Sequence, residues 1–158
     1  MPISDYLKNL RAHVGHALIL MPATATFIFN DEGHILLQRR SDSGLWGMPG
    51  GVIDPGETAA QAGVREAYEE TGLRVKPERC IGIVRHRNTY PNGDEIEVHI
   101  TVFRCLVLGG QLESIDGESL ELRYFPTDEL PDSEILKPYP AVLFDPNYQG
   151  CYFEWQDI

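Results

Sequence analysis

The stretch that decides the fold of this chain reads Gly51-Val-Ile-Asp-Pro-Gly-Glu57-Thr-Ala-Ala-Gln-Ala-Gly-Val-Arg65-Glu66-Ala-Tyr-Glu69-Glu70-Thr-Gly72-Leu73. Its first part is rich in glycine and proline, a composition typical of a loop. From about Thr58 to Thr71 it lacks proline and is rich in alanine and glutamate, which favours a helix. Thr58 is placed to cap this helix, and Gly72 is placed to end it in a left-handed conformation. We therefore predict a loop, a helix and a second loop.

The predicted helix carries a group of carboxylates on one side. Glu66 is three residues before Glu69 and four before Glu70, so the side chains are surface neighbours with Cβ atoms roughly 5–6 Å apart. Crowded carboxylates repel one another unless a cation lies between them. Mg²⁺ or Mn²⁺ would suit, since hard cations take oxygen ligands. A solvated acidic helix face is the alternative interpretation.

Other residues of the helix are expected to hold it in place. Ala60, Val64 and Ala67 recur at helical spacing and are expected to face a core. Arg65 is placed to pair with Glu69 four residues later, or to reach back to Glu57 across the turn.

The order of residues in this stretch resembles the Nudix box of the Nudix hydrolases. A glycine is followed by five residues and Glu57, then by seven residues and Arg65-Glu66. Two residues then precede Glu69-Glu70, and one more precedes Gly72 and an aliphatic residue. The one departure is Ala67, where a larger aliphatic residue is commoner. The motif covers 23 residues, and the element order extends the resemblance more loosely over roughly Ala17 to Leu130.

The resemblance implies an α/β fold, an α/β/α sandwich around a mixed β-sheet. It also implies metal-dependent hydrolysis of a nucleoside diphosphate linked to another moiety. Metal ions neutralise such a diphosphate and lower the pKa of a bound water, whose proton a carboxylate can take. In the motif Glu57 and Arg65 brace the loop against the helix, and Glu66 serves as the base in some members. The motif's metal-binding residues correspond here to Glu66, Glu69, Glu70 and, through its backbone carbonyl, Gly50.

One more acid from outside the motif is often recruited in this family. Glu118 is our first choice for a catalytic role beside the three helix glutamates, because it lies in a Gly-flanked loop before a late strand. Glu121, Asp94 and Glu95 compete with it, and an exposed acidic loop is the alternative.

The substrate is not encoded in the motif. Dinucleoside polyphosphates, ADP-ribose, nucleoside triphosphates, sugar nucleotides and coenzyme A derivatives all occur in the family. Tyr90 lies 17 residues after Leu73, where some members that cleave dinucleoside polyphosphates carry a tyrosine. Arg39 and Arg40 are candidates for a phosphate, since guanidinium groups match phosphate oxygens, and surface arginines are the alternative. Trp46 either stacks on a base or anchors the core.

The rest of the chain alternates between strand and turn signals. A short N-terminal helix is expected over about residues 4–14, capped by Ser4, and an irregular tail over about 131–158. A break or bulge is expected at Pro22. Hairpins are expected across Asp31-Glu32-Gly33 and Tyr90–Asp94. The predicted strands are Ala17–Met21, Ala23–Asn30, His34–Arg39, Arg74–Arg87, Glu95–Leu108 (ended by Gly109-Gly110) and Leu120–Phe125, followed by the start of a helix at Thr127–Leu130 and a tail or strand at Cys151–Trp155.

Length and composition limit the function further. The 158 residues are 42% hydrophobic, which fits one domain over residues 1–158 with an adequate core. A net charge of −11 argues against nucleic-acid polymers and anionic membranes as partners. Three widely spaced cysteines show no zinc spacing or disulfide framework, so a reducing cytoplasm is expected. No signal peptide or long apolar run is present, so no membrane span is expected.

The expected partner is a small nucleotide-derived substrate, and a homodimer is left open. Two other classes of protein remain as alternatives. One is a nucleotide-binding regulatory module of the same fold without catalysis, which would be expected to lose helix glutamates. The other is an acidic interaction protein whose helix merely resembles the motif.

Overall fold

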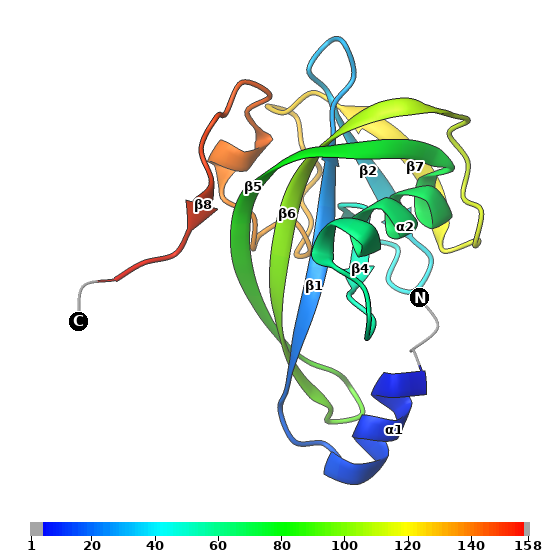
Figure 1. Ribbon diagram of the computed structural model, residues 1–158, viewed down its shortest axis with the longest axis vertical. Helices are drawn as coiled ribbons and strands as arrows, with labels where there is room; N and C mark the ends of the chain where they lie inside the picture. The colour runs from blue at the N-terminus through cyan, green and yellow to red at the C-terminus, as the bar shows by residue number, and fades with distance from the viewer. Residues whose placement is uncertain (1–4, 157–158) are drawn as a thin grey trace.

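The computed structural model describes residues 5–156 and places a mixed five-stranded sheet at the centre of the fold (Figure 1). The strand order is β4-β1-β6-β5-β8, and a second sheet has the order β3-β2-β7. The α/β class and the mixed sheet are confirmed. The elements are α1 Asp5–Val14, β1 Ile19–Ile28, β2 Ile35–Arg40, β3 Trp46–Gly47, β4 Gly50–Val52, α2 Ala59–Thr71, β5 Leu73–Thr89, β6 Glu95–Gly110, β7 Ser119–Phe125, the 3₁₀-helix η1 Ala141–Phe144 and β8 Tyr152–Phe153.

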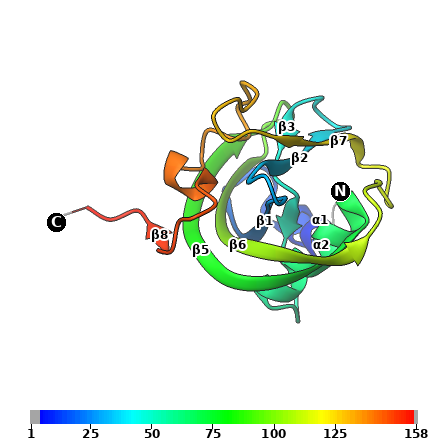
Figure 2. The ribbon, with the colours of Figure 1, turned by 90° about the horizontal axis from the view of Figure 1, so that it is seen from above.

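The strand β1, which lies between β4 and β6, separates two layers because its side chains alternate between the faces of the sheet. Thr24 and Thr26 face α2, where Gly63 packs so closely that a Cβ on it would lie 3.1 Å from Thr24 Oγ1. Ala25 and Phe27 face the larger core, which also contains buried residues of β2, β5, β6 and η1. Seen from above, β5 and β6 curve around one side of the molecule and the three-stranded sheet lies opposite them (Figure 2).

The expected break or bulge at Pro22 is wrong, because β1 runs through it without a shift in register against β6. The carbonyl oxygen of Pro22 accepts a hydrogen bond from the Ile53 amide at 3.1 Å. The proline nitrogen therefore faces the side of β4, where the strand pairing ends at Val52. No ladder bond to β6 is lost, and the proline is tolerated.

The expected hairpin between the first two strands forms only as a turn. Asn30 Oδ1 accepts hydrogen bonds from the amides of Glu32 and His34, and the chain reverses there. Only Phe29 and Ile35 then pair, as an isolated bridge. Both edges of β1 are occupied, by β4 and β6, so β2 pairs with β3 and β7 in the second sheet.

The expected hairpin of β5 and β6 is present, closed by a turn in which the Tyr90 amide donates to the carbonyl oxygen of Asp94 at 2.9 Å. The glycine pair that was expected to end β6 instead continues it, with Gly110 opposite Leu73. A Cβ on Gly110 would lie 2.3 Å from the carbonyl oxygen of Gly72, so glycine is required by close backbone contact rather than by a strand end.

The predicted helix start at Thr127–Leu130 is wrong, since that segment forms turns. The C-terminal region beyond it is irregular except for η1 and β8, which pairs in parallel with β5.

The N-terminal helix is present as α1 and lies at one end of the sheet, beside the turn between β5 and β6 (Figure 1). Leu7 and Leu10 pack against a small core of Ile19, Met21 and Ile96. Ser4, its expected cap, lies outside the described residues. Within residues 5–156, neither helix has the length and apolarity needed to cross a lipid bilayer.

Candidate active site

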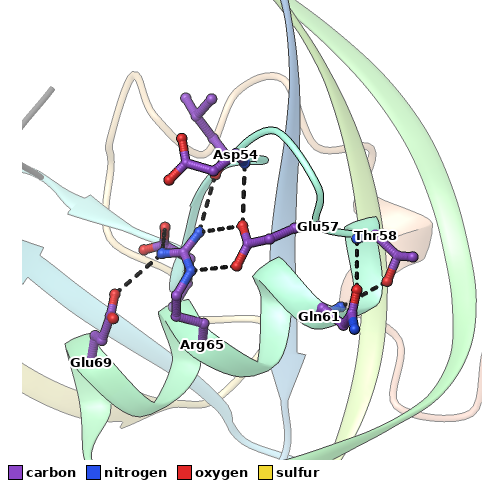
Figure 3. Close-up of polar contacts among 8 residues, drawn as sticks. Asp54, Glu57, Thr58, Gln61, Arg65 and Glu69 are labelled. Atoms are coloured by element: carbon purple, nitrogen blue, oxygen red, sulfur yellow. Dashed lines mark hydrogen bonds and ion pairs between the residues drawn. The ribbon is translucent and has the colours of Figure 1, made fainter. Parts of the chain in front are cut away.

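The helix α2 begins and ends as its sequence predicts. Thr58 Oγ1 accepts a hydrogen bond from the Gln61 amide at 3.3 Å, and Gln61 Oε1 accepts one from the Thr58 amide at 2.9 Å (Figure 3). This reciprocal pair satisfies two amides at the start of the helix. Gly72 ends the helix with φ 71°, and its amide donates to Tyr68 at 2.8 Å. The ends fix which side chains face the preceding loop.

Arg65 connects that loop to the helix. Its Nε donates to Glu57 Oε1 at 2.7 Å, and its Nη2 donates to Glu57 Oε2 at 2.8 Å (Figure 3). Glu57 Oε2 also accepts from the Asp54 amide at 3.2 Å. The guanidinium of Arg65, followed by the Asp54 amide, lowers the pKa of the Glu57 carboxyl despite partial burial. Glu57 therefore carries its charge and stabilises the turn from within.

The same arginine also contacts the carboxylates of the helix. Its Nη1 donates to Glu66 Oε1 at 2.7 Å and to Glu69 Oε2 at 3.2 Å. Of the two partners proposed from the sequence, Glu57 and Glu69, the structure shows both. One guanidinium thus offsets part of the charge of three carboxylates.

Two of the helix glutamates are almost entirely buried. Glu66 and Glu70 each retain 1% of their exposure, whereas the Glu69 side chain keeps 42%. Burial raises the pKa of Glu66 to about 7, against the lowering effect of Arg65. Burial raises the pKa of Glu70 to about 8, although hydrogen bonds from Gln38 and the Gly50 amide oppose it. Buried carboxyls whose pKa values are raised by several units are typical of functional sites.

Glu70 is held in position by neighbours from three elements. The Gly50 amide, at the start of β4, donates to Glu70 Oε2 at 2.7 Å. The hydroxyl of Ser119 in β7 lies 3.0 Å from the carbonyl oxygen of Glu70 and 2.5 Å from Oε1 of Gln38 in β2. Gly50 thus orients the side chain of Glu70, and Ser119 holds its backbone.

Gly50 itself admits no other residue. Its φ is 156°, and a Cβ there would lie 2.2 Å from the carbonyl oxygen of Thr24. Here the observed contact with the glutamates is made by its amide. The role of its carbonyl as a metal ligand remains a prediction.

The chemistry of this group fits a hard divalent cation. Its donors are carboxylate oxygens, which Mg²⁺ and Mn²⁺ prefer. The raised pKa values of Glu66 and Glu70 favour the protonated carboxyls until a cation replaces the protons. In the described residues 5–156, no three acidic, histidine or cysteine side chains already converge on one point in the manner of a finished metal site. Arg65 lies between Glu66 and Glu69.

Glu118 lies near this group, whereas its sequence competitors are engaged elsewhere. The negative charge of Glu118 contributes to raising the pKa of both Glu66 and Arg40, and its carbonyl oxygen accepts from the Ser41 amide at 2.8 Å. The competitors form ion pairs with other residues: Glu121 with Arg39 and Arg123, Asp94 with His16, and Glu95 with Arg87.

A cleft of about 860 Å³ runs from the glutamate end of the fold to α1. Gly50, Val52 and Asp54 line it at one end, and Tyr90 lines it at the other. Its floor is apolar and comes from the inward-facing residues of two central strands, Ile19, Met21, Ala23, Ile96 and Val98. Gly50 connects this cleft to the buried Glu70, and the apolar part of the cleft is large enough for a small organic molecule.

The two arginines proposed for phosphate binding differ in their relation to the cleft, and the pairing register of β2 shifts between them. Arg40 lines the cleft and donates two hydrogen bonds to Asp42, at 3.0 and 2.7 Å. This pairing lowers the pKa of Asp42 to about 2 and raises that of Arg40. Arg39 faces away from the cleft lining and lies 3.4 Å from Glu121 on β7.

Trp46 packs as an anchor at the second sheet. Its ring lies edge-on to Phe125, with centroids 4.8 Å apart, and Arg123 lies over it at 5.7 Å. It does not line the cleft described above.

Sequence reasoning missed two parts of the site. Gln38 is wholly buried in β2 of the three-stranded sheet and contacts Glu70 of α2. No spacing in the sequence connects the two residues. Leu7, Lys8 and Arg11 of α1 line the cleft, and no signal in the sequence of this helix shows that a cleft lies beside it.

Known proteins resemble this chain over most of its length. The family model described as NUDIX domain matches residues 19–144. A MutT-like protein of Streptomyces ambofaciens is 33% identical over 123 residues, which cover 78% of this chain and 74% of that protein. An ADP-ribose pyrophosphatase of Methanocaldococcus jannaschii is 33% identical over 133 residues, covering 78% and 76%. A solved ADP-ribose pyrophosphatase of Streptococcus suis shares the fold, with a TM-score of 0.63 at 24% identity over 83% of this chain and 97% of that one.

Proposed function

Because this chain belongs to the NUDIX family and is a pyrophosphohydrolase, we propose that it hydrolyses the diphosphate linkage of a nucleoside diphosphate joined to another moiety. We further propose Mg²⁺ as its cofactor, with Mn²⁺ as a substitute, and residues 1–158 as one domain. The observation that carries the proposal is the position of two buried glutamates, Glu66 and Glu70, behind the end of the cleft that Gly50 lines.

Each residue near the glutamates has a task in this reaction. When bound, the divalent ions supply charge neutralisation at the diphosphate and lower the pKa of a bound water. Glu66, Glu69 and Glu70 would hold the ions, and the Gly50 amide orients the Glu70 carboxylate through its hydrogen bond. Glu118 is the proposed acceptor of the water's proton, with Glu66 as the alternative acceptor.

The bracing pair acts on shape rather than on the substrate. Arg65 fixes the loop through Glu57, and this loop carries Asp54, which lines the cleft beside Val52 of β4. A phosphorus atom has to lie within reach of both the ions and the proton acceptor, so a displaced loop misplaces the substrate.

The apolar part of the cleft is the proposed site of the nucleoside. A base has two apolar faces and polar edges, and this part of the cleft offers an apolar floor with Tyr90, Asn92 and Arg11 at its rim. Arg40 is the nearer of the two arginines for a phosphate oxygen, since it lines the same cleft, and Arg39 is retained as a weaker candidate.

The finer choice of substrate lies among dinucleoside polyphosphates, ADP-ribose and other nucleotide derivatives. Tyr90 favours the first, and the pyrophosphatase relative from M. jannaschii is described as acting on ADP-ribose. Nucleoside triphosphates are the second candidate, supported by a Bacillus subtilis relative described as a putative 8-oxo-dGTP diphosphatase, 36% identical over 104 residues.

A panel of nucleotides tests the proposal. The protein is incubated with each compound in Mg²⁺, and the products are separated and identified, with Glu66→Gln as the inactive control. Cleavage of a diphosphate linkage in at least one compound, lost in chelator and in the variant, is expected. Tight binding of a nucleotide without any cleavage would instead identify a regulatory module. The absence of both binding and cleavage would identify an acidic interaction protein.

Two further proposals concern the setting of the enzyme. Free thiols at Cys80, Cys105 and Cys151 support a location in the reducing cytoplasm. A homodimer is a proposal that light scattering of the purified chain tests directly.

A further inference from the structure

Two cysteines that are 71 positions apart in the sequence meet at the outer edge of the five-stranded sheet. Sγ of Cys80, in β5, lies 3.8 Å from Sγ of Cys151, which directly precedes β8. Both cysteines are free thiols. A disulfide places its sulfurs about 2 Å apart, so a rotation of the side chains that shortens the contact by roughly 2 Å would allow a bond.

Contacts on the neighbouring residues hold the two segments together. β8 pairs with β5, with Tyr152 opposite Gly82. Arg79 donates to the carbonyl oxygens of Gln149 at 2.9 Å and Tyr148 at 3.2 Å. These bonds lie on both sides of the cysteine pair, so the fold itself brings the thiols into contact.

The two thiols differ in access to solvent. Cys151 is exposed and Cys80 half-buried, so a dissolved reagent meets Cys151 first and finds Cys80 in contact behind it. Cys105 is buried in β6, where burial raises its pKa to about 12, and this keeps it unreactive. An exposed thiol beside a second one is the arrangement in which a mixed disulfide is resolved within the molecule.

We propose that Cys80 and Cys151 are a modification site at which a reversible intramolecular disulfide forms, with a low-molecular-weight disulfide such as oxidised glutathione as the oxidant. The Cys151 thiolate attacks one sulfur of the oxidant, whose S–S bond breaks, and one glutathione leaves as a thiolate that takes up a proton. The Cys80 thiolate then attacks Cys151 Sγ and displaces the second glutathione. Two protein thiols become one disulfide, and the oxidant is reduced to two thiols.

The bond would fasten the C-terminal segment to the sheet. β8 consists of two residues only, and the second of them, Phe153, is 65% exposed, so the segment is weakly held at its end. Closing a long loop removes freedom from the unfolded chain, and the expected rise in Tm is roughly 5–15 °C. β8 and β4 are at opposite edges of the sheet, so turnover is expected to be unchanged by oxidation.

The test uses the whole protein and oxidised glutathione at about pH 8.5, because burial and contact with Cys80 raise the pKa of the Cys151 thiol. Free thiols are counted and the linked peptides identified by mass spectrometry. The expected result is one free thiol left of three in each chain and a Cys80–Cys151 link within one chain that dithiothreitol reverses. Three unreacted thiols, a persistent glutathione adduct or a link between two chains would each overturn the proposal.

Two variants control the assignment. Cys80→Ser is expected to stop at a glutathione adduct on Cys151, since no second thiol resolves it. Cys105→Ala is expected to form the disulfide as the unaltered chain does. An internal disulfide in Cys80→Ser would overturn the pairing of Cys80 with Cys151. This outcome can be read even if Cys105→Ala is unstable.

Discussion

Arg65 and Glu57 form a two-point ion pair that joins the helix α2 to the loop before it, with hydrogen bonds of 2.7 and 2.8 Å. The same guanidinium donates to the buried Glu66 at 2.7 Å. The shape of the cleft wall and the charge of the glutamate group therefore depend on one side chain. This dual role makes Arg65 a sensitive position for a test of stability.

Arg65→Ala is expected to destabilise the metal-free protein by about 2 kcal/mol, between the ~1 kcal/mol of exposed pairs and the ~3–5 kcal/mol of buried ones. The pair is partly exposed, at 30% and 24% of the side chains, which places it between these limits. Urea unfolding in chelator measures the effect. Arg85→Ala, which removes a 58%-exposed arginine paired with Glu97, is the matched control. Equal midpoints for the two variants would show that the brace is not structural.

The stability of the metal-free protein is expected to fall as the pH rises from about 5 to about 8. Folding raises the pKa of Glu66 to about 7 and of Glu70 to about 8 from the usual 4.5. In this window the folded state holds protons that the unfolded state has lost. Each rise of one pH unit therefore lowers the free energy of unfolding by up to about 1.4 kcal/mol per group. Urea midpoints across the window measure it.

Glu70→Gln supplies the control for this pH dependence. The amide cannot titrate, so the slope of the unfolding free energy against pH should lose the contribution of the Glu70 proton and become shallower. A midpoint that rises with pH in the unaltered chain, or an unchanged slope in the variant, would contradict the burial of a protonated Glu70.

Glu118→Gln is expected to lower kcat about 100-fold with a small change in KM, as removal of a general base does. Raised metal concentration should not restore the rate, because the lost function is proton transfer. Glu121→Gln is the control, since Glu121 lies on the next strand but pairs with Arg39 and Arg123. Similar kcat values for the two variants would remove Glu118 from the mechanism.

Tyr90→Ala is expected to raise KM about 5- to 150-fold with little change in kcat, if the ring stacks on a base with about 1–3 kcal/mol. Tyr90→Phe keeps the ring and should keep the KM. Tyr6→Ala is the matched control, because Tyr6 is an exposed tyrosine of α1 outside the cleft lining. An unchanged KM in Tyr90→Ala would place the nucleoside elsewhere.

The local parts of the site could be predicted from the sequence because short-range rules govern them. The ends of α2, the spacing of its glutamates and the β5–β6 turn depend on residues a few positions apart. The burial of Glu66 and Glu70 could not be predicted in this way. It results from β2 and β7, which bring Gln38 and Ser119 against Glu70 from a second sheet.

Strand partners were the least predictable feature. The turn after β1 specifies a reversal, but occupied edges of β1 decide that β2 pairs elsewhere. Likewise, Pro22 breaks a ladder only if its nitrogen faces a paired strand, and that side is set by the neighbours of β1. The contact of Cys80 with Cys151 has the same origin, since it depends on β8 returning to β5.

A metal titration of turnover at saturating substrate, comparing the unaltered chain with Glu70→Gln, tests the central claim that α2 holds the catalytic ions. The account predicts no turnover in excess chelator for either protein. It also predicts that Glu70→Gln requires a higher Mg²⁺ concentration and recovers part of its rate when that concentration is raised. Full turnover of the unaltered chain in chelator, or unaltered activity of Glu70→Gln at limiting Mg²⁺, would contradict it.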